Sequence, residues 1–411
     1  MQKFEKHSPV VVTEVTTRHE LRQFMQYPNR LYADNPNYIP SFYGDDLSDW
    51  TPGKNPAFDY CEARCWLAWR DGEIVGRIGA ILSHKANDKF GTHRMRFSQV
   101  DFVDDSEVSA ALFGTVERWA RQKGCDQVHG PLGFTDMDRE GMLVEGFDRR
   151  SLFITNYNAP YYPEHLTRLG YRKDVDWIEY RISVPAPGSA EAERLHKLSE
   201  FILKRKHLHV ATLHHKSEYG PFVRQVFELV NAAYAPLYGV VELSDEQIER
   251  YANKFIPLVD PDFVCFVLDE QDKLVAFGVT TLDPSPALKH SDGRLFPFGW
   301  AEVLNDLHHG DTLIMLLTAV RPDLQTEGIN AVMMDHVCQS CNRHGVQFAE
   351  TGPMLELNDH ILAQWKRLEK EQHKRRRCFI KDLDHGINAA NAAAAAQAEA
   401  PEAAPAAESA E

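Results

Sequence analysis

The stretch Thr312–Met334, with the sequence TLIMLLTAVRPDLQTEGINAVMM, decides how this chain is interpreted. Its first part, Thr312–Val320, is almost continuously apolar, which is typical of a strand buried on both faces. Pro322 then interrupts the pattern, because proline has no N–H to donate to a sheet ladder. Apolar residues at helical spacing follow from about Ile329. The stretch therefore predicts a strand, a loop and a helix.

The loop of this unit is suited to binding an anion. Backbone N–H groups of residues 325–330 would lie at a helix N-terminus, where unpaired donors and the helix dipole attract negative charge. Gly328 would let a phosphate approach the backbone, since it carries no Cβ. An ordinary strand-to-helix turn is the alternative. The candidate cofactor-binding residues are Val320, Gln325, Thr326, Glu327, Gly328, Ile329, Asn330 and Ala331.

Composition limits the classes of function. The chain has 411 residues, more than one core usually fills, so two domains are expected. Its net charge of −15 argues against a basic nucleic-acid-binding face. The N-terminus has no signal-like apolar segment, which favours a cytoplasmic protein and leaves peripheral contact with the inner membrane open. Cys338-x-x-Cys341 has no second pair at zinc spacing, so no metal site is expected.

The order of predicted elements occurs twice. In the first half, Asp71-Gly72 between two apolar runs predicts a β-hairpin. A helix-ending glycine, a short strand and Gly-Pro occur at 124–131 and again at 345–353. We therefore expect an α/β (α+β) protein with two tandem domains. The predicted ranges are 1–186 for the first domain, 187–208 for a linker with a bridging helix, 209–386 for the second domain, and 387–411 for a disordered Ala/Pro/Glu tail.

This order resembles the GNAT superfamily of N-acetyltransferases, present here twice. The pyrophosphate loop of that fold, Gln/Arg-x-x-Gly-x-Gly/Ala, is matched by Gln325–Ala331, with Asn330 where a second glycine is usual. The resemblance implies a mixed, mostly antiparallel twisted sheet flanked by helices in each domain. It also implies acetyl-CoA or another acyl-CoA as co-substrate, and no metal.

Across nearly the whole chain, the sequence is also similar to large tandem GNAT-like proteins that resemble bacterial ceramide synthases. The matching segments are 130–136, 140–148, 295–300 and 374–377. This resemblance implies an N-acyltransferase of lipid metabolism that acylates a primary amine, such as a sphingoid base or another amino lipid. The donor would be acyl-CoA or an acyl carrier protein. The alternatives are a Fem-like tRNA-dependent aminoacyl or peptidyl transferase, and a non-catalytic acyl-CoA-binding protein.

The two copies differ at the cofactor loop. The equivalent segment of the first copy, Val103–Ala111, has no glycine and places Asp104, Asp105 and Glu107 where phosphates would bind. Carboxylates there stabilise the helix terminus themselves and repel a pyrophosphate. One cofactor site, in the second copy, is therefore predicted.

Catalytic candidates follow that loop in the chain. An ammonium group must lose a proton before it attacks a thioester, and Glu350 at a strand end is the candidate base, with a solvated strand-end acid as the alternative. Asn358 falls at the spacing of a helix motif of the superfamily and is the second catalytic candidate. Trp365 stands where that motif has a tyrosine that often protonates the leaving thiolate, and an indole is not a useful acid.

Three further segments have open interpretations. Glu140 and Glu145 are candidate substrate residues, or parts of a charged surface loop. Leu295–Trp300 could line an acyl path, touch a bilayer, or simply belong to the core. Lys374–Arg377 could meet an acidic carrier protein, the 3′-phosphate of CoA or anionic lipid, or form the basic edge of a strand.

Overall fold

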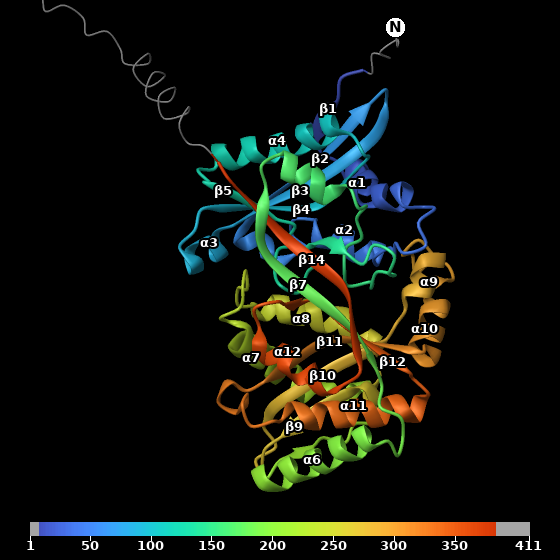
Figure 1. The fold of residues 1–411 in the computed structure, drawn as a ribbon. Helices are drawn as coiled ribbons and strands as arrows, with labels where there is room; N and C mark the ends of the chain where they lie inside the picture. Colours follow the sequence, from blue (N-terminus) through green and yellow to red (C-terminus); the bar gives the residue numbers. More distant parts are fainter. Residues whose placement is uncertain (1–7, 384–411) are drawn as a thin grey trace, which may run out of the picture.

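The computed structural model describes residues 8–383, which form a mixed α/β structure around one 14-stranded sheet (Figure 1). The predicted tail at 387–411 lies outside the described residues. The first half contains β1 (Val11–Glu14), α1 (Arg18–Leu31), α2 (Tyr43–Asp49), β2 (Cys61–Arg70), β3 (Glu73–Ser83), α3 (His84–Phe90), β4 (Arg94–Phe102), α4 (Ser106–Gln122), β5 (Gln127–Gly130), β6 (Met142–Glu145), α5 (Tyr162–Arg168) and β7 (Arg172–Ser183).

The linker helix α6 leads into a second half with a similar order of elements. These are α6 (Ala190–Lys206), β8 (His209–Val210), α7 (Gly220–Tyr234), α8 (Asp245–Phe255), β9 (Val264–Leu268), β10 (Leu274–Leu282), α9 (Ser285–His290), α10 (Gly299–His309), β11 (Thr312–Val320), α11 (Asn330–His344), β12 (Phe348–Thr351), β13 (Met354–Leu355), α12 (Asp359–Ala363) and β14 (Lys370–Asp382).

Local sequence signals explain several of these elements. Asp71 and Gly72 both have positive φ, as the tight turn between β2 and β3 requires. Gly345 adopts the left-handed conformation that ends α11. The β-hairpin predicted around Asp71-Gly72 is therefore confirmed.

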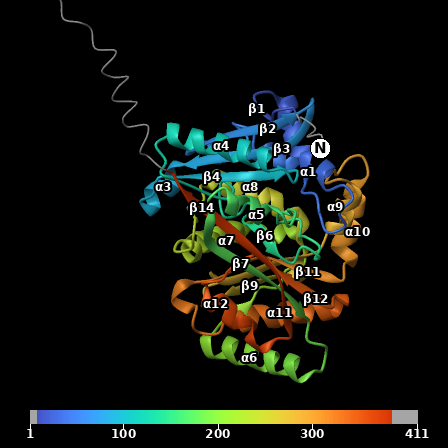
Figure 2. The same ribbon diagram turned by 45° about the horizontal axis from the view of Figure 1, so that its top comes forward.

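The two halves exchange their last strands. The strand order is β1-β2-β3-β4-β5-β14-β7-β12-β11-β10-β9-β8. Strand β14 of the second half pairs with β5 of the first, while β7 of the first half pairs with β12 of the second. Both views show β7 and β14 crossing the centre of the molecule (Figures 1 and 2). The domain boundaries at 186 and 209 stay a prediction, and the sheet crosses them.

Within each half, one pair of neighbouring strands is parallel. These pairs are β4 with β5 and β11 with β12, and each is linked through a helix, α4 or α11. Helix α6 packs along α11 at the outer end of the second half. The helix-bearing connection between β11 and β12 positions the candidate site.

Candidate active site

A cavity of about 170 Å³ lies where β11 and β12 separate. The parallel ladder extends from Thr312 and Phe348 to Met315 and Thr351, whereas β11 continues to Val320. The wedge that opens between the strands is covered mainly by apolar side chains. Its lining includes Leu316, Leu317, Thr318, Met333, Met334, Val337, Cys338, Ala349, Gly352, Pro353, Ile361 and Trp365. The cavity also reaches Asn330 at the start of α11.

A bulge in β11 faces this cavity. The register with β10 passes from Leu317 directly to Met315, so Leu316 has no opposite residue. Bulges leave backbone groups of the extra residue unpaired and commonly occur next to active sites. The wall of the cavity thus offers main-chain hydrogen-bonding capacity beside an apolar space.

The predicted phosphate loop adjoins the cavity. Gly328 has a φ of +80°, and a Cβ there would lie 3.2 Å from the Ile202 side chain of α6. Helix α11 begins without a side-chain N-cap, so no side chain accepts from its first N–H groups. The Ala331 and Val332 N–H groups donate instead to the carbonyls of Gly328 and Ile329, both at 2.9 Å. Thr326, Glu327 and Gly328 are exposed, while Val320, Ile329 and Ala331 are buried beneath them. The Gln325 amide folds back and donates to the carbonyl of Val320 at 3.3 Å.

The negative charge of Glu327 within this loop is offset by α6. Lys206 Nζ lies 2.5 Å from the Glu327 carboxylate, and this contact holds the pKa of Glu327 below its usual range. The ion pair brings a basic helix end to the loop. The sequence did not indicate this contact, because Lys206 and Glu327 are far apart along the chain.

Glu350 lies on the other face of β12. Ala349 and Thr351 line the cavity, so the side chain between them points to the opposite face of the sheet. Its carboxylate accepts a hydrogen bond from Lys374 Nζ at 3.3 Å. Burial raises the pKa of Glu350, and the Lys374 ammonium opposes that rise. The side chain is 13% exposed, which leaves a raised-pKa carboxylate with limited solvent contact next to the wedge.

Lys374 belongs to a buried charge cluster that the sequence did not reveal. Glu179 of β7 accepts a hydrogen bond from Arg376 Nε at 2.5 Å, and Lys374 Nζ lies 3.6 Å from the same carboxylate. All three side chains are fully buried. Burial would raise the pKa of Glu179, but Arg376 and Lys374 hold it below its usual value. Lys374–Arg377 is thus part of the central ladder, in keeping with the strand interpretation.

A loop of the first half covers this charged face. We call residues 146–158 the bridging loop. Arg150 bonds Asp283 of the second half at 2.6 Å, and Arg149 bonds Glu371 at 2.6 Å. The Asn156 carbonyl accepts a hydrogen bond from Arg376. Both halves therefore build the side of the sheet on which Glu350 lies.

Asn358 and Trp365 have structural contacts near the cavity. The Asn358 side chain caps α12, accepting from the Ile361 N–H at 3.3 Å, and it is not among the cavity-lining residues. Trp365 is buried in the wall, and its Nε1 donates to the Met354 sulfur at 3.2 Å. The packing interpretation of Trp365 is thus the one that these contacts support.

Glu140 and Glu145 lie in the first half and are not brought together. Glu145 ends β6, is exposed, and pairs with Arg375 of β14 at 3.2 Å. Glu140 lies in the loop before β6, where burial and the neighbouring Asp136 raise its pKa well above the ordinary value. Burial also raises the pKa of Asp136, to about 6. This segment concentrates carboxylates, as the sequence indicated.

The position in the first half that corresponds to the phosphate loop is occupied by side chains of the chain itself. Asp105 caps α4, accepting from the N–H groups of Glu107 at 2.8 Å and Val108 at 3.3 Å. Arg70 bonds both Asp105 and Glu107. Beyond the parallel ladder, Tyr162 Oη accepts from the Phe102 N–H at 2.7 Å and its ring stacks on Phe102. Tyr162 thus fills the end of the space between β4 and β5 that adjoins Phe102.

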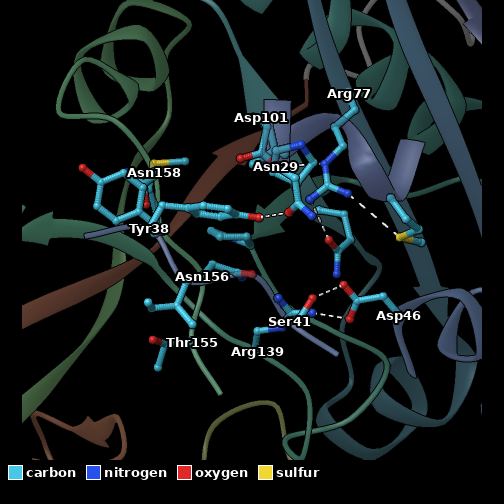
Figure 3. A pocket seen from close by; sticks show the side chains of 18 of the residues that line it. Asn29, Tyr38, Ser41, Asp46, Arg77, Asp101, Arg139, Thr155, Asn156 and Asn158 are labelled. Atoms are coloured by element: carbon cyan, nitrogen blue, oxygen red, sulfur yellow. Dashed lines mark hydrogen bonds and ion pairs between the residues drawn. The ribbon is translucent and has the colours of Figure 1, made fainter. Parts of the chain in front are cut away.

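A second cavity, in the first half, is polar and small (Figure 3). Asp46 accepts hydrogen bonds from Ser41 and Arg139, and Asn29 accepts one from Tyr38. Arg77 pairs with Asp101 at 2.7 Å. The volume of this second cavity, about 40 Å³, suits a few water molecules at ~10–15 Å³ each rather than an acyl chain.

One trio within residues 8–383 has metal-ligating atoms close together, His129, Asp174 and Cys378. Tyr238 Oη hydrogen-bonds all three, at 2.8, 2.5 and 3.5 Å respectively. We interpret the trio as a hydrogen-bond network around that hydroxyl.

Comparisons with known proteins agree with this architecture. No protein-family model matches the chain. Protein YghO of Escherichia coli is 27% identical over 383 residues, covering 91% of this chain and 95% of that protein. The bacterial ceramide synthase of Caulobacter vibrioides is 28% identical over 299 residues, covering 71% and 75% of the two chains.

A solved structure supports the fold. A tandem GNAT protein from the clavulanic acid biosynthesis pathway superposes with a TM-score of 0.52 at 13% identity, covering 91% of this chain and 99% of that one. The chain therefore has the tandem GNAT fold, and in sequence it resembles a bacterial ceramide synthase.

Proposed function

We propose that this protein is an N-acyltransferase that transfers an acyl group from a phosphopantetheine thioester to a primary amine. The observation that carries the proposal is the apolar wedge between β11 and β12, which meets the uncapped start of α11. The tandem GNAT fold and the ceramide synthase relative support acyl transfer in general. The donor, acyl-CoA or an acyl carrier protein, and the acceptor, a sphingoid base or another amino lipid, are the specific parts of the proposal.

The wedge and loop suit an acylated donor. Phosphate oxygens would accept from backbone N–H groups of the loop from Gly328 to Asn330, and the Lys206–Glu327 pair reduces repulsion from the loop. An apolar cavity of about 150 Å³ takes up benzene, so one of about 170 Å³ accepts considerably more than an acetyl methyl. The cavity therefore favours an acyl group larger than acetyl.

Glu350 supplies the base in this proposal. A primary ammonium, with a pKa of about 10, must be deprotonated before attack, and a carboxylate with a raised pKa is a better proton acceptor than an ordinary one. The amine would approach from the Glu350 face, where the bridging loop provides first-half residues. Glu350 takes one proton from the ammonium, and the freed nitrogen lone pair then bonds to the thioester carbonyl carbon. The C–S bond breaks, and the second proton lost by the nitrogen passes through solvent to the leaving thiolate.

The leaving thiolate needs no strong acid. A thiol has a pKa of about 8.5, so its thiolate leaves more readily than an alkoxide and can take a proton from water. This explains how Trp365 can stand where a phenol is usual. The same tryptophan supports the rival, a protein that binds acyl-CoA without turning it over.

One assay tests the proposal and its rival. The full chain is incubated with palmitoyl-CoA or acetyl-CoA and a panel of amines that includes a sphingoid base. Thiol release is followed, and the product is identified by mass. We expect amine-dependent thiol release and an N-acyl product with the longer donor. Donor binding by calorimetry without any turnover would establish the non-catalytic rival, and absence of donor binding would refute both.

A further inference from the structure

A group of large apolar side chains projects from the segment between α9 and α10 and from the first turns of α10. Phe296, Phe298, Trp300 and Leu304 are 81%, 75%, 46% and 41% exposed. We call these four residues the aromatic tip. The other exposed large apolar residues of 8–383 are spread over four separate segments. Single exposed apolar residues need no explanation, but a cluster of this kind marks an interaction surface.

A tightly packed turn holds the aromatic tip in place. A Cβ on Gly299 would lie 2.1 Å from the carbonyl oxygen of Arg294, so this close approach requires glycine. The Trp300 N–H donates to the Leu295 carbonyl at 2.8 Å, and Leu295 packs into the core beneath. Gly293 lies so close to Ser41 that a Cβ added to Gly293 would be 1.9 Å from the Ser41 carbonyl oxygen. The rings are therefore presented outward by packed backbone.

The indole of Trp300 is prepared for an apolar environment. Its Nε1 donates to the carbonyl of Pro297 at 3.2 Å, within the tip itself. Burying the ring in lipid would thus leave no unpaired indole donor, which removes the main cost of burying tryptophan.

Charges around the aromatic tip largely cancel. The two carboxylates of α10 turn back to α9, because Glu302 bonds His290 at 2.7 Å and Asp306 accepts from the Ala287 N–H at 2.9 Å. Arg294, His308 and His309 are exposed beside the tip. Asp292 is an exposed carboxylate in the preceding turn.

We propose that the aromatic tip inserts into the interfacial region of a lipid bilayer. Phenylalanine and tryptophan rings are favoured at that depth. None of the helices within residues 8–383 is long and apolar enough to span a bilayer, so the tip would act as a peripheral anchor. The inference does not depend on acyl transfer.

Vesicle binding tests this proposal without any enzymatic readout. The full chain is sedimented with vesicles of phosphatidylcholine alone, and of phosphatidylcholine with phosphatidylglycerol. We expect the wild type to bind vesicles of phosphatidylcholine alone, since insertion of the rings does not need anionic lipid. The F296S/F298S double variant should weaken this binding roughly 100-fold, since burial of each phenyl ring contributes about tenfold or more. The matched control is Phe201→Ser on α6, which removes another exposed ring and should leave binding unchanged.

Because both phenylalanines are exposed, the double variant should keep the wild-type melting temperature. Equal vesicle binding by the wild type and the double variant would overturn the proposal, as would failure of the wild type to bind. Light scattering gives an independent result. If the wild type is a dimer and the double variant a monomer, the tip is a self-association surface and the membrane proposal is wrong.

Discussion

The loops before α4 and α11 occupy equivalent places in the two halves, and the chain completes them differently. Before α4, the Asp105 carboxylate caps the helix and Arg70 neutralises it, while Tyr162 fills the space beside Phe102. Before α11 there is no side-chain cap, and the space beside Leu316 is a cavity. A duplicated fold can thus retain one binding site by leaving one helix start uncapped and one wedge unfilled.

The two halves also contribute differently to the candidate site. The first half has lost the free helix start, but its bridging loop and its strand β7 contact the second half around Glu350 and Glu179. The first half therefore contributes contacts to the face of the sheet on which Glu350 lies. Four substitutions would break or sharpen this comparison, beginning with the largest expected effect.

Glu350→Gln should reduce kcat by about 10²- to 10⁴-fold, the usual contribution of a general base. Its raised pKa means that the wild-type rate should fall as the pH decreases through a value above that of an ordinary glutamate, because the protonated carboxyl cannot accept a proton. That acidic limb should disappear in the variant. Donor affinity, measured by calorimetry, should not change. Full activity with the same pH profile would show that Glu350 is not the base.

Gly328→Asp should weaken donor binding by about 10- to 100-fold, since a carboxylate at this loop repels phosphate. Aspartate tolerates the positive φ of this position better than most residues. Gly124→Asp is the matched control, because Gly124 also has positive φ and is exposed, but follows α4 in the first half. If both variants bind the donor equally well, the loop before α11 is not the phosphate site.

Met334→Trp should narrow the cavity and change the preference for acyl length. Met334 lines the cavity and is only half-buried, so a larger side chain can be accommodated. We expect kcat/KM for a palmitoyl donor to fall about tenfold while that for acetyl-CoA changes little, because each buried methylene is worth about 0.8 kcal/mol. Met334→Leu conserves volume and should retain the wild-type preference. Equal losses with both donors would place the acyl chain elsewhere.

The sequence predicted the helices and strands better than it predicted which strands pair with each other. Asp71-Gly72, Gly345 and the apolar run at Thr312–Val320 act locally, so the hairpin, the end of α11 and the buried strand could be recognised. The exchange of β7 and β14 could not, because pairing between distant strands leaves no mark in either strand's own pattern.

The candidate site was predictable only in part: its loop could be recognised from the sequence, but the buried charge cluster could not. The loop at Gln325–Ala331 carries its own signature, and the structure places it beside a cavity. In β7, Glu179 and Arg181 alternate with apolar residues and would be expected to face solvent; the second half covers Glu179 instead. The aromatic tip was left open between core and surface, because Phe296-Pro-Phe298 is equally apolar in either place.

Asp105→Ala should have the smallest effect on activity, yet it tests the comparison directly. Loss of the cap should reduce stability by about 0.5–2 kcal/mol. Asp105→Asn, which keeps a capping oxygen, should cost less. Hydrogen bonding from Arg70 holds the pKa of Asp105 below its value in the unfolded chain, about 3.9. The contribution of its charge is thus present above that pH and is lost as the pH falls through the lower, folded value. Melting temperatures of Asp105→Asn and the wild type should therefore converge in acid.

The same variant determines how many donor sites the fold retains. With Tyr162 and Phe102 still filling the wedge, removal of the Asp105 carboxylate alone should not create a second site, and calorimetry should show one donor per chain. Two donors bound to Asp105→Ala would mean that the cap by itself had closed the first site. The aromatic filling would then be a consequence of that closure, and the loop before α4 would still be able to hold phosphate.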